Sequence, residues 1–93
     1  MRTALVTGAT SGIGAATVRT LAASGWRCVA TGRRRERLDA LVAELGADKV
    51  HAACFDIRDG AAFDGALAAL PGEFAGIDLL VNNAGLAQGL SPA

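Results

Sequence analysis

The sequence predicts an α/β fold in which a doubly wound parallel sheet carries helices on both faces. Short apolar runs recur along the chain, and segments whose apolar residues have helical spacing separate them. This alternation is typical of parallel strands joined by right-handed crossovers. Glycine, arginine, aspartate and asparagine residues follow the apolar runs directly, where the carboxyl ends of parallel strands meet and ligands bind.

Composition limits the classes of protein to which the chain could belong. With 93 residues, 52% of them hydrophobic and 19% charged, it is at most one folded domain and is not a disordered chain. The formal net charge of zero gives no overall field that would attract nucleic acid or an anionic membrane. No apolar run is long enough to span a bilayer, and the first strand follows Met1 and Arg2 without a signal peptide. We therefore expect a cytoplasmic protein.

The first expected strand covers residues 3–7 and leads through a glycine-rich turn into a helix over 12–24. Alanines allow this helix to lie close to the sheet, and Ser24-Gly25 ends it. The second strand, 27–31, shows no polar alternation, as expected for a strand that is covered on both faces.

The second half of the chain continues the same alternation of strands and helices. Gly46 ends the second helix, and Pro71-Gly72 ends the third. Cys28 and Cys54 fall in predicted buried strands, which predicts reduced core thiols rather than a disulfide or a metal site. The later elements are expected at 34–45 (helix), 50–55 (strand), 60–70 (helix) and 77–81 (strand).

The glycine-rich turn, Thr7-Gly-Ala-Thr-Ser-Gly-Ile-Gly14, is the strongest local signal of a binding site. A strand, a glycine turn and a helix present unpaired N–H groups to a phosphate at the positive end of the helix dipole. Thr10 and Ser11 could bind the phosphate or cap the helix. The spacing G-x-x-x-G-x-G departs from the usual G-x-G-x-x-G, so a tight turn without a ligand is the alternative.

Arginines follow the second strand, where NAD-binding proteins carry an acidic residue for the ribose 2′-hydroxyl. Gly32 stands at that position, and Arg33 and Arg34 come next. Two guanidinium groups suit a 2′-phosphate, and cations are unfavourable at a helix N-terminus unless an anion joins them. The pattern predicts NADP, with NAD the weaker candidate. A solvated helix start over 33–37 is the alternative.

Together these residues resemble the short-chain dehydrogenase/reductase family. The resemblance rests on residues 7–14, on Asp56-Ile57 and on Asn82-Asn-Ala-Gly85, in the order and spacing of that family. Residues 30–38 and 80–87 look most like those of the NADP-dependent 3-hydroxy acid dehydrogenases, which oxidise serine, allo-threonine and related acids. The resemblance covers essentially the whole chain. It implies the N-terminal half of a Rossmann-type sheet with strand order 3-2-1-4.

The resemblance also implies roles for individual residues. Asp56 would accept a hydrogen bond from the adenine amino group beside the backbone of Ile57, although a turn or cap aspartate is the alternative. Asn82 is expected to brace the sheet rather than bind the ligand. The implied cofactor-binding residues are Gly8, Thr10, Ser11, Gly12, Ile13, Gly14, Arg33, Arg34, Asp56, Ile57, Asn83, Ala84 and Gly85.

The residues that do the chemistry in that family are missing. The family uses a tyrosine as acid/base and a lysine four residues later, but this chain has no tyrosine, and its lysine, Lys49, precedes the third strand. We therefore expect the first, nucleotide-binding half of one Rossmann domain, inactive alone, from a homo-oligomeric parent that acts on a small-molecule substrate. A free-standing nucleotide-binding module without turnover is the alternative.

Overall fold

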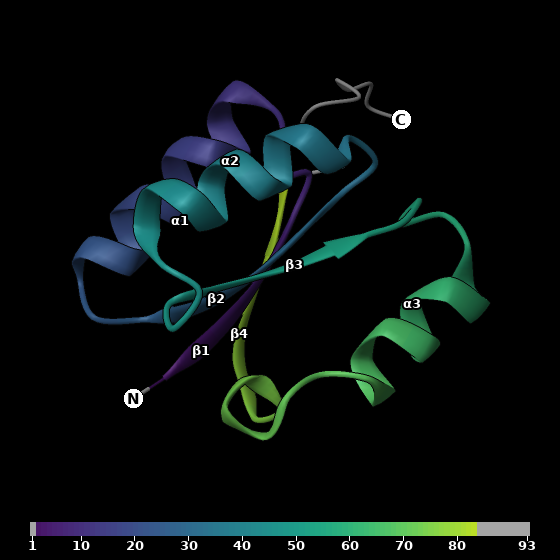
Figure 1. Ribbon diagram of the computed structural model, residues 1–93. Coiled ribbons are helices and arrows are strands. Elements are labelled where there is room, and N and C mark those ends of the chain that lie inside the picture. Colours follow the sequence, from purple (N-terminus) through teal and green to yellow (C-terminus); the bar gives the residue numbers. More distant parts are fainter. Residues whose placement is uncertain (1, 84–93) are drawn as a thin grey trace.

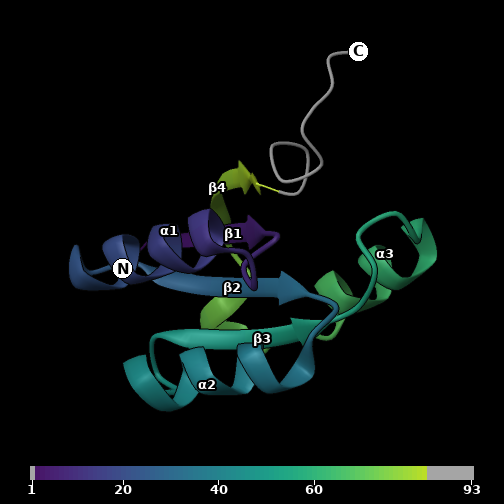
Figure 2. The same ribbon diagram turned by 90° about the horizontal axis from the view of Figure 1, so that it is seen from above.

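In a computed structural model of the protein, which describes residues 2–83, four parallel strands form one sheet. The strand order is β3-β2-β1-β4, which confirms the predicted topology and is easily followed in Figure 2. The two central strands lie between neighbours, and β3 and β4 lie at the edges. The strands are β1 (Thr3–Thr7), β2 (Arg27–Gly32), β3 (Val50–Cys54) and β4 (Ile77–Asn82).

Helices cover both faces of the sheet, as the sequence predicted. The helices α1 (Gly12–Ala23) and α2 (Arg35–Leu45) lie on one face, and α3 (Gly60–Ala68) lies on the other (Figure 1). A short 3₁₀ turn, η1 (Gly72–Phe74), precedes β4. It was not predicted, and it places Phe74 in the core of the α3 face.

The element boundaries differ from the prediction by one or two residues for physical reasons. Arg34 has extended backbone angles, so α2 begins at Arg35 instead of Arg34. The helix α3 ends at Ala68 rather than at Leu70. Leu70 precedes Pro71, and the proline ring disfavours helical angles at the residue before it.

The core lies on both sides of β1 because successive side chains of a strand point to opposite faces. Ala4 and Val6 pack with Val18 of α1 and Leu38 of α2 in one cluster. Leu5 points the other way and packs with neighbours that include Phe74. All five residues of β1 are buried, which explains why its sequence lacks polar alternation.

The edge position of β3 corrects one expectation about the cysteines. Both thiols are free, but only Cys28 of the inner strand β2 is fully buried, whereas Cys54 at the end of β3 is partly buried. Burial raises the pKa of the Cys28 thiol to about 11. The thiolate of Cys28, which is the reactive form, is therefore scarce at neutral pH.

This contrast predicts an order of reactivity toward a thiol reagent. We expect Cys54 to be labelled readily at pH 8 in the folded protein, and Cys28 only after unfolding or at much higher pH. Mass spectrometry of the labelled peptides measures the order. Labelling of Cys28 as fast as Cys54 in the folded protein would contradict the burial of β2.

The strand β4 is an exposed apolar edge of the sheet. Leu79 and Leu80 are 39% and 57% exposed, and among the described residues only β1 pairs with β4. An apolar edge with unpaired backbone groups favours pairing with another strand. We expect a sample of residues 1–93 alone to self-associate in sedimentation velocity, and a monodisperse monomer would contradict this expectation.

Within residues 2–83, no helix combines the length and the hydropathy that a bilayer-spanning helix needs.

Candidate functional site

A pocket of about 330 Å³ lies beyond the carboxyl ends of β1, β2 and β3. It is the kind of crevice in which ligands of doubly wound sheets bind. Most of the predicted site residues after these strands line it, whereas Gly12, Ile13 and Gly14 continue into α1 beside it. The lining residues are Gly8, Thr10, Ser11, Thr31, Gly32, Arg33, Arg34, Arg37, Phe55, Asp56, Ile57 and Arg58.

Ser11 holds the glycine-rich turn together and caps α1. Gly8 has a φ of 63°, in the left-handed region that favours glycine, and its carbonyl oxygen accepts the Ser11 hydroxyl at 2.8 Å. The Ser11 hydroxyl oxygen in turn accepts the N–H of Gly14 at 3.0 Å. Of the two interpretations of Ser11, the helix cap is therefore the one that the geometry supports directly.

The start of α1 retains unpaired donors. Among the described residues, the backbone N–H groups of Thr10, Gly12 and Ile13 have no hydrogen-bond partner. The first turn of α1 contains no acidic side chain that would compensate the helix dipole. Together the free donors and the dipole form an anion-binding end of the helix next to the pocket.

The glycines of the turn serve different purposes. A Cβ on Gly14 would overlap the carbonyl oxygen of Gly8 and stand 2.7 Å from the carbonyl carbon, so Gly14 allows α1 to pack against the turn. A Cβ on Gly32 would lie 2.8 Å from Thr10 Cγ2, so any larger residue at the end of β2 would displace Thr10. A Cβ on Gly12 would meet nothing within 4 Å. The space before α1 is therefore open to a phosphate group.

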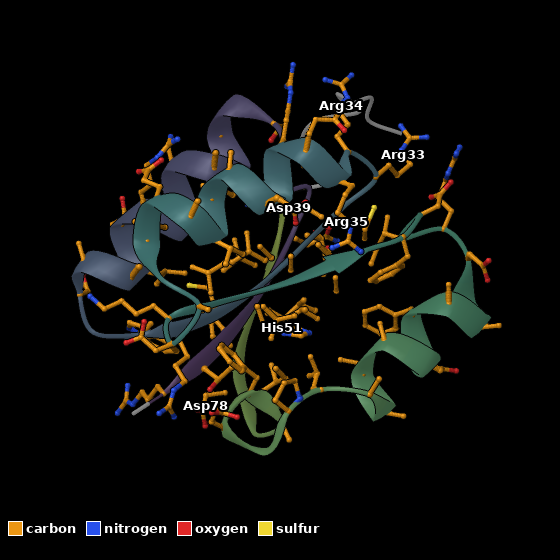
Figure 3. All side chains as sticks on the ribbon, in the orientation of Figure 1. Arg33, Arg34, Arg35, Asp39, His51 and Asp78 are labelled. Carbon is orange, nitrogen blue, oxygen red and sulfur yellow. The ribbon has the colours of Figure 1, made fainter. Side chains whose placement is uncertain are left out.

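Four arginines surround the other end of the pocket. Arg33, Arg34 and Arg37 reach it from the end of β2 and the first turn of α2, and Arg58 reaches it from the loop after β3. Figure 3 shows Arg33 and Arg34 at the end of the sheet opposite Asp78. This concentration of positive charge in a neutral chain suits an anionic ligand.

The arginines of residues 33–37 do not all behave as a solvated helix start would. Arg35 fits that alternative, since its Nη1 lies 3.6 Å from Oδ1 of Asp39 on the same helix and it does not line the pocket. Arg37, in the first turn of α2, points back toward β1, and its Nη1 donates to the Thr10 carbonyl oxygen at 3.3 Å. Sequence reasoning did not single out Arg37, although its position three residues after Arg34 places both on one helix face.

Asp56 is held in a tight turn by Arg58. Its Oδ1 accepts the backbone N–H of Arg58 at 3.0 Å and Nε at 3.1 Å, and its Oδ2 accepts Nη2 at 2.8 Å. These hydrogen bonds, with the charges of Arg58 and Arg33, keep the pKa of Asp56 well below its usual range. The helix cap is instead Asp59, whose Oδ1 accepts the N–H of Ala62 at 3.1 Å.

The adjoining backbone of Ile57 is available for a ligand. Within the part of the chain that the structure describes, its N–H has no hydrogen-bond partner, and Ile57 lines the pocket beside the Asp56 carboxylate. An ionised carboxylate accepts and a free N–H donates, so this pair could bind the amino group and a ring nitrogen of a purine.

The asparagines after β4 differ in role. The Thr7 hydroxyl donates to Asn82 Oδ1 at 2.9 Å, which ties β4 to β1 and agrees with the structural role expected for Asn82. Asn83 is buried, and its amide nitrogen has no partner within residues 2–83. The expectations for Ala84 and Gly85 lie outside the described residues.

The amino ends of the strands, on the side of the sheet away from the pocket, carry Lys49 and His51. Lys49 precedes β3 at the amino edge, far from the carboxyl ends. The His51 ring packs against Phe74 at 5.5 Å between centroids, as a core residue does. In the described part of the chain, no three histidine, cysteine, aspartate or glutamate residues gather in a way that could hold a metal ion.

Several named relatives share most of this sequence. The chain is 58% identical over 91 residues to a serine 3-dehydrogenase of Agrobacterium fabrum, which covers 98% of this chain and 36% of that protein. It is 52% identical over 89 residues to the NADP-dependent 3-hydroxy acid dehydrogenase YdfG of Escherichia coli K12, again covering 36% of that protein. The chain thus spans about a third of the length of these relatives.

Solved structures agree with the sequence relatives. A closed form of serine dehydrogenase complexed with NADP⁺ superposes with a TM-score of 0.80 at 46% identity, over 84% of this chain and 31% of that chain. Serine dehydrogenase from Escherichia coli gives 0.79 at 45% identity, over 84% and 35%. The family profile described as short chain dehydrogenase matches residues 2–93. The chain belongs to the short-chain dehydrogenase family.

Proposed function

We propose that this chain is the NADP(H)-binding part of an oxidoreductase that transfers hydride between the cofactor and a hydroxyl or carbonyl substrate. The observation that carries the proposal is that the free N–H groups at the start of α1 lie beside the pocket that the arginines after β2 line. Phosphate groups match both features. The serine 3-dehydrogenase and 3-hydroxy acid dehydrogenase relatives favour a 3-hydroxy acid such as serine as the substrate.

The proposal assigns a task to each part of the pocket. The turn containing Gly8 and the start of α1 hold the pyrophosphate, with Gly14 allowing their close packing. Arg33 and Arg34 bind the 2′-phosphate. The remaining assignments are Asp56 and Ile57 to the adenine, and Asn83, Ala84 and Gly85 to the ribose on the nicotinamide side. Bound NADP supplies the hydride acceptor, or the donor when it is reduced.

The acid/base chemistry is proposed to come from residues beyond these 93. The family's tyrosine and lysine, four residues apart, have no match here, since the chain contains no tyrosine. The match to about a third of each relative's length supports a division in which this part binds the nucleotide. We also propose a cytoplasmic homo-oligomer for the whole protein, as the family resemblance implies.

A spectrophotometric assay tests the oxidoreductase proposal. We expect the protein that contains this chain to reduce NADP⁺ faster than NAD⁺ with serine, allo-threonine or another 3-hydroxy acid, followed at 340 nm. Residues 1–93 alone should give no turnover. If the whole protein bound NADPH yet turned over no hydroxyl or carbonyl substrate, the alternative of a nucleotide-binding module without catalysis would replace this proposal.

A further inference from the structure

The pocket contains one acidic group among its arginines. Asp56 is the single carboxylate among the described lining residues, and Arg33, Arg34, Arg37 and Arg58 line the same space. An unneutralised carboxylate here would repel a phosphate and attract the guanidinium groups that ought to bind it. The neighbours of Asp56 therefore decide how much positive charge the pocket offers.

Arg58 donates hydrogen bonds to both oxygens of the Asp56 carboxylate. Its Nε lies 3.1 Å from Oδ1 and its Nη2 lies 2.8 Å from Oδ2, in a bidentate arrangement that a backbone hydrogen bond reinforces. Arg33 stands further off, with its Nη1 4.0 Å from Oδ2 of Asp56. Arg58 thus forms a close ion pair with the carboxylate, whereas Arg33 makes only a long approach to one of its oxygens.

We propose that Arg58 is a positioning residue that neutralises Asp56 and so leaves Arg33 available for the 2′-phosphate of NADP(H). The inference rests on the proposed binding of NADP(H) in this pocket. Without Arg58, the Asp56 carboxylate would pair with Arg33, and the phosphate would have to compete for that guanidinium. Arg58 then sets the preference for NADPH over NADH through Asp56 and does not touch the cofactor phosphate.

A role in stability alone accounts poorly for this cluster. The side chains of Arg58 and Arg33 are 68% and 69% exposed, and exposed ion pairs add little to folding stability because solvent screens them. The low pKa of Asp56, caused first by the side-chain hydrogen bond from Arg58, agrees with a carboxylate that stays ionised and neutralised by its neighbour. Removing Arg58 should therefore change cofactor selectivity more than folding stability.

The experiment compares dissociation constants for NADPH and NADH across matched variants of the whole protein. The variants are R58A, R58K, D56N and the double variant R58A/D56N. R35A is the control, since it removes the same charge from an arginine that pairs with Asp39 and does not line the pocket. Circular dichroism and thermal unfolding check that each variant folds, and ¹³C NMR follows the Asp56 carboxyl in R58A and R58K.

We expect R58A to lower the preference for NADPH roughly fivefold, the factor that corresponds to ~1 kcal/mol for unit charges about 4 Å apart in water. R58K should retain part of the preference, and R35A all of it. In the D56N background, R58A should change the preference little, because the competing carboxylate is gone. In R58A the pKa of Asp56 should rise toward its ordinary value.

Three results would overturn the inference. Equal loss for both cofactors in R58A would mean that Arg58 shapes the loop without affecting selectivity. A selective loss that persists in the D56N background would mean that Arg58 binds the phosphate directly. An unchanged preference in R58A would leave Arg58 without a part in selectivity. If the unaltered protein itself binds NADPH no better than NADH, the proposed NADP function fails instead, so the two failures are distinguishable.

Discussion

Replacing Gly14 with alanine is expected to lower the free energy of unfolding by about 3 kcal/mol and to abolish cofactor binding. The new Cβ would overlap the Gly8 carbonyl oxygen and stand 2.8 Å from Cα of Ala9. Both are backbone atoms, so no side chain can rotate away, and α1 would have to shift off the turn. Urea denaturation measures the first effect, and titration with NADPH measures the second.

Gly12→Ala is the matched control, because it adds the same methyl group two residues earlier on the same helix. A Cβ there meets nothing within 4 Å and φ is not positive, so we expect unchanged or slightly higher stability. Its affinity for NADPH should fall, because the methyl group fills space that the pyrophosphate would use. Equal stability of the Gly14→Ala and Gly12→Ala variants would contradict the packing of α1 against the turn.

Arg33→Ala is expected to weaken NADPH binding roughly ten- to a hundredfold while leaving NADH binding nearly unchanged. A hydrogen bond to a charged group contributes about 1.5–3 kcal/mol to binding. NADH has no 2′-phosphate, so it makes no such bond to Arg33 and loses nothing when Arg33 is removed. Arg33 is exposed and makes only a 4.0 Å approach to Asp56, so its removal should cost little stability. Isothermal titration with each dinucleotide measures the difference.

The control for Arg33→Ala is again R35A, which lies two residues later and pairs with Asp39 instead of lining the pocket. It should leave both affinities as they are. An equal loss of NADPH and NADH affinity in Arg33→Ala would refute the assignment of Arg33 to the 2′-phosphate.

The alternation of strands and helices was predictable because its signals are local and repeated, whereas the strand order came from the family resemblance. Apolar runs without polar alternation, such as Ala4-Leu5-Val6, indicate strands that are buried on both faces. Glycine or proline soon after each helix indicates where the helix ends. The turn η1 escaped prediction because three residues show no period, and only the burial of Phe74 reveals its purpose. The incomplete burial of Cys54 depends on the edge position of β3, which strand propensity does not encode.

The parts of the candidate site that depend on backbone geometry were predictable, whereas those that depend on which partners long side chains contact were less so. Gly8 and Gly14 follow from the strand, turn and helix pattern. Arg37 and Arg58 were missed, since their place in the pocket depends on a bond across the turn to Thr10 and on a tight turn at Asp56. Long arginine side chains reach several partners, and sequence spacing does not select among them.

The most direct test of the central claim is a binding titration of NADPH and NADH against a folded sample of the protein that contains residues 1–93. NADPH is expected to bind at least about tenfold more tightly than NADH, because only NADPH offers a 2′-phosphate to the arginines of the pocket. A sample that is demonstrably folded and has no affinity for either dinucleotide would contradict it.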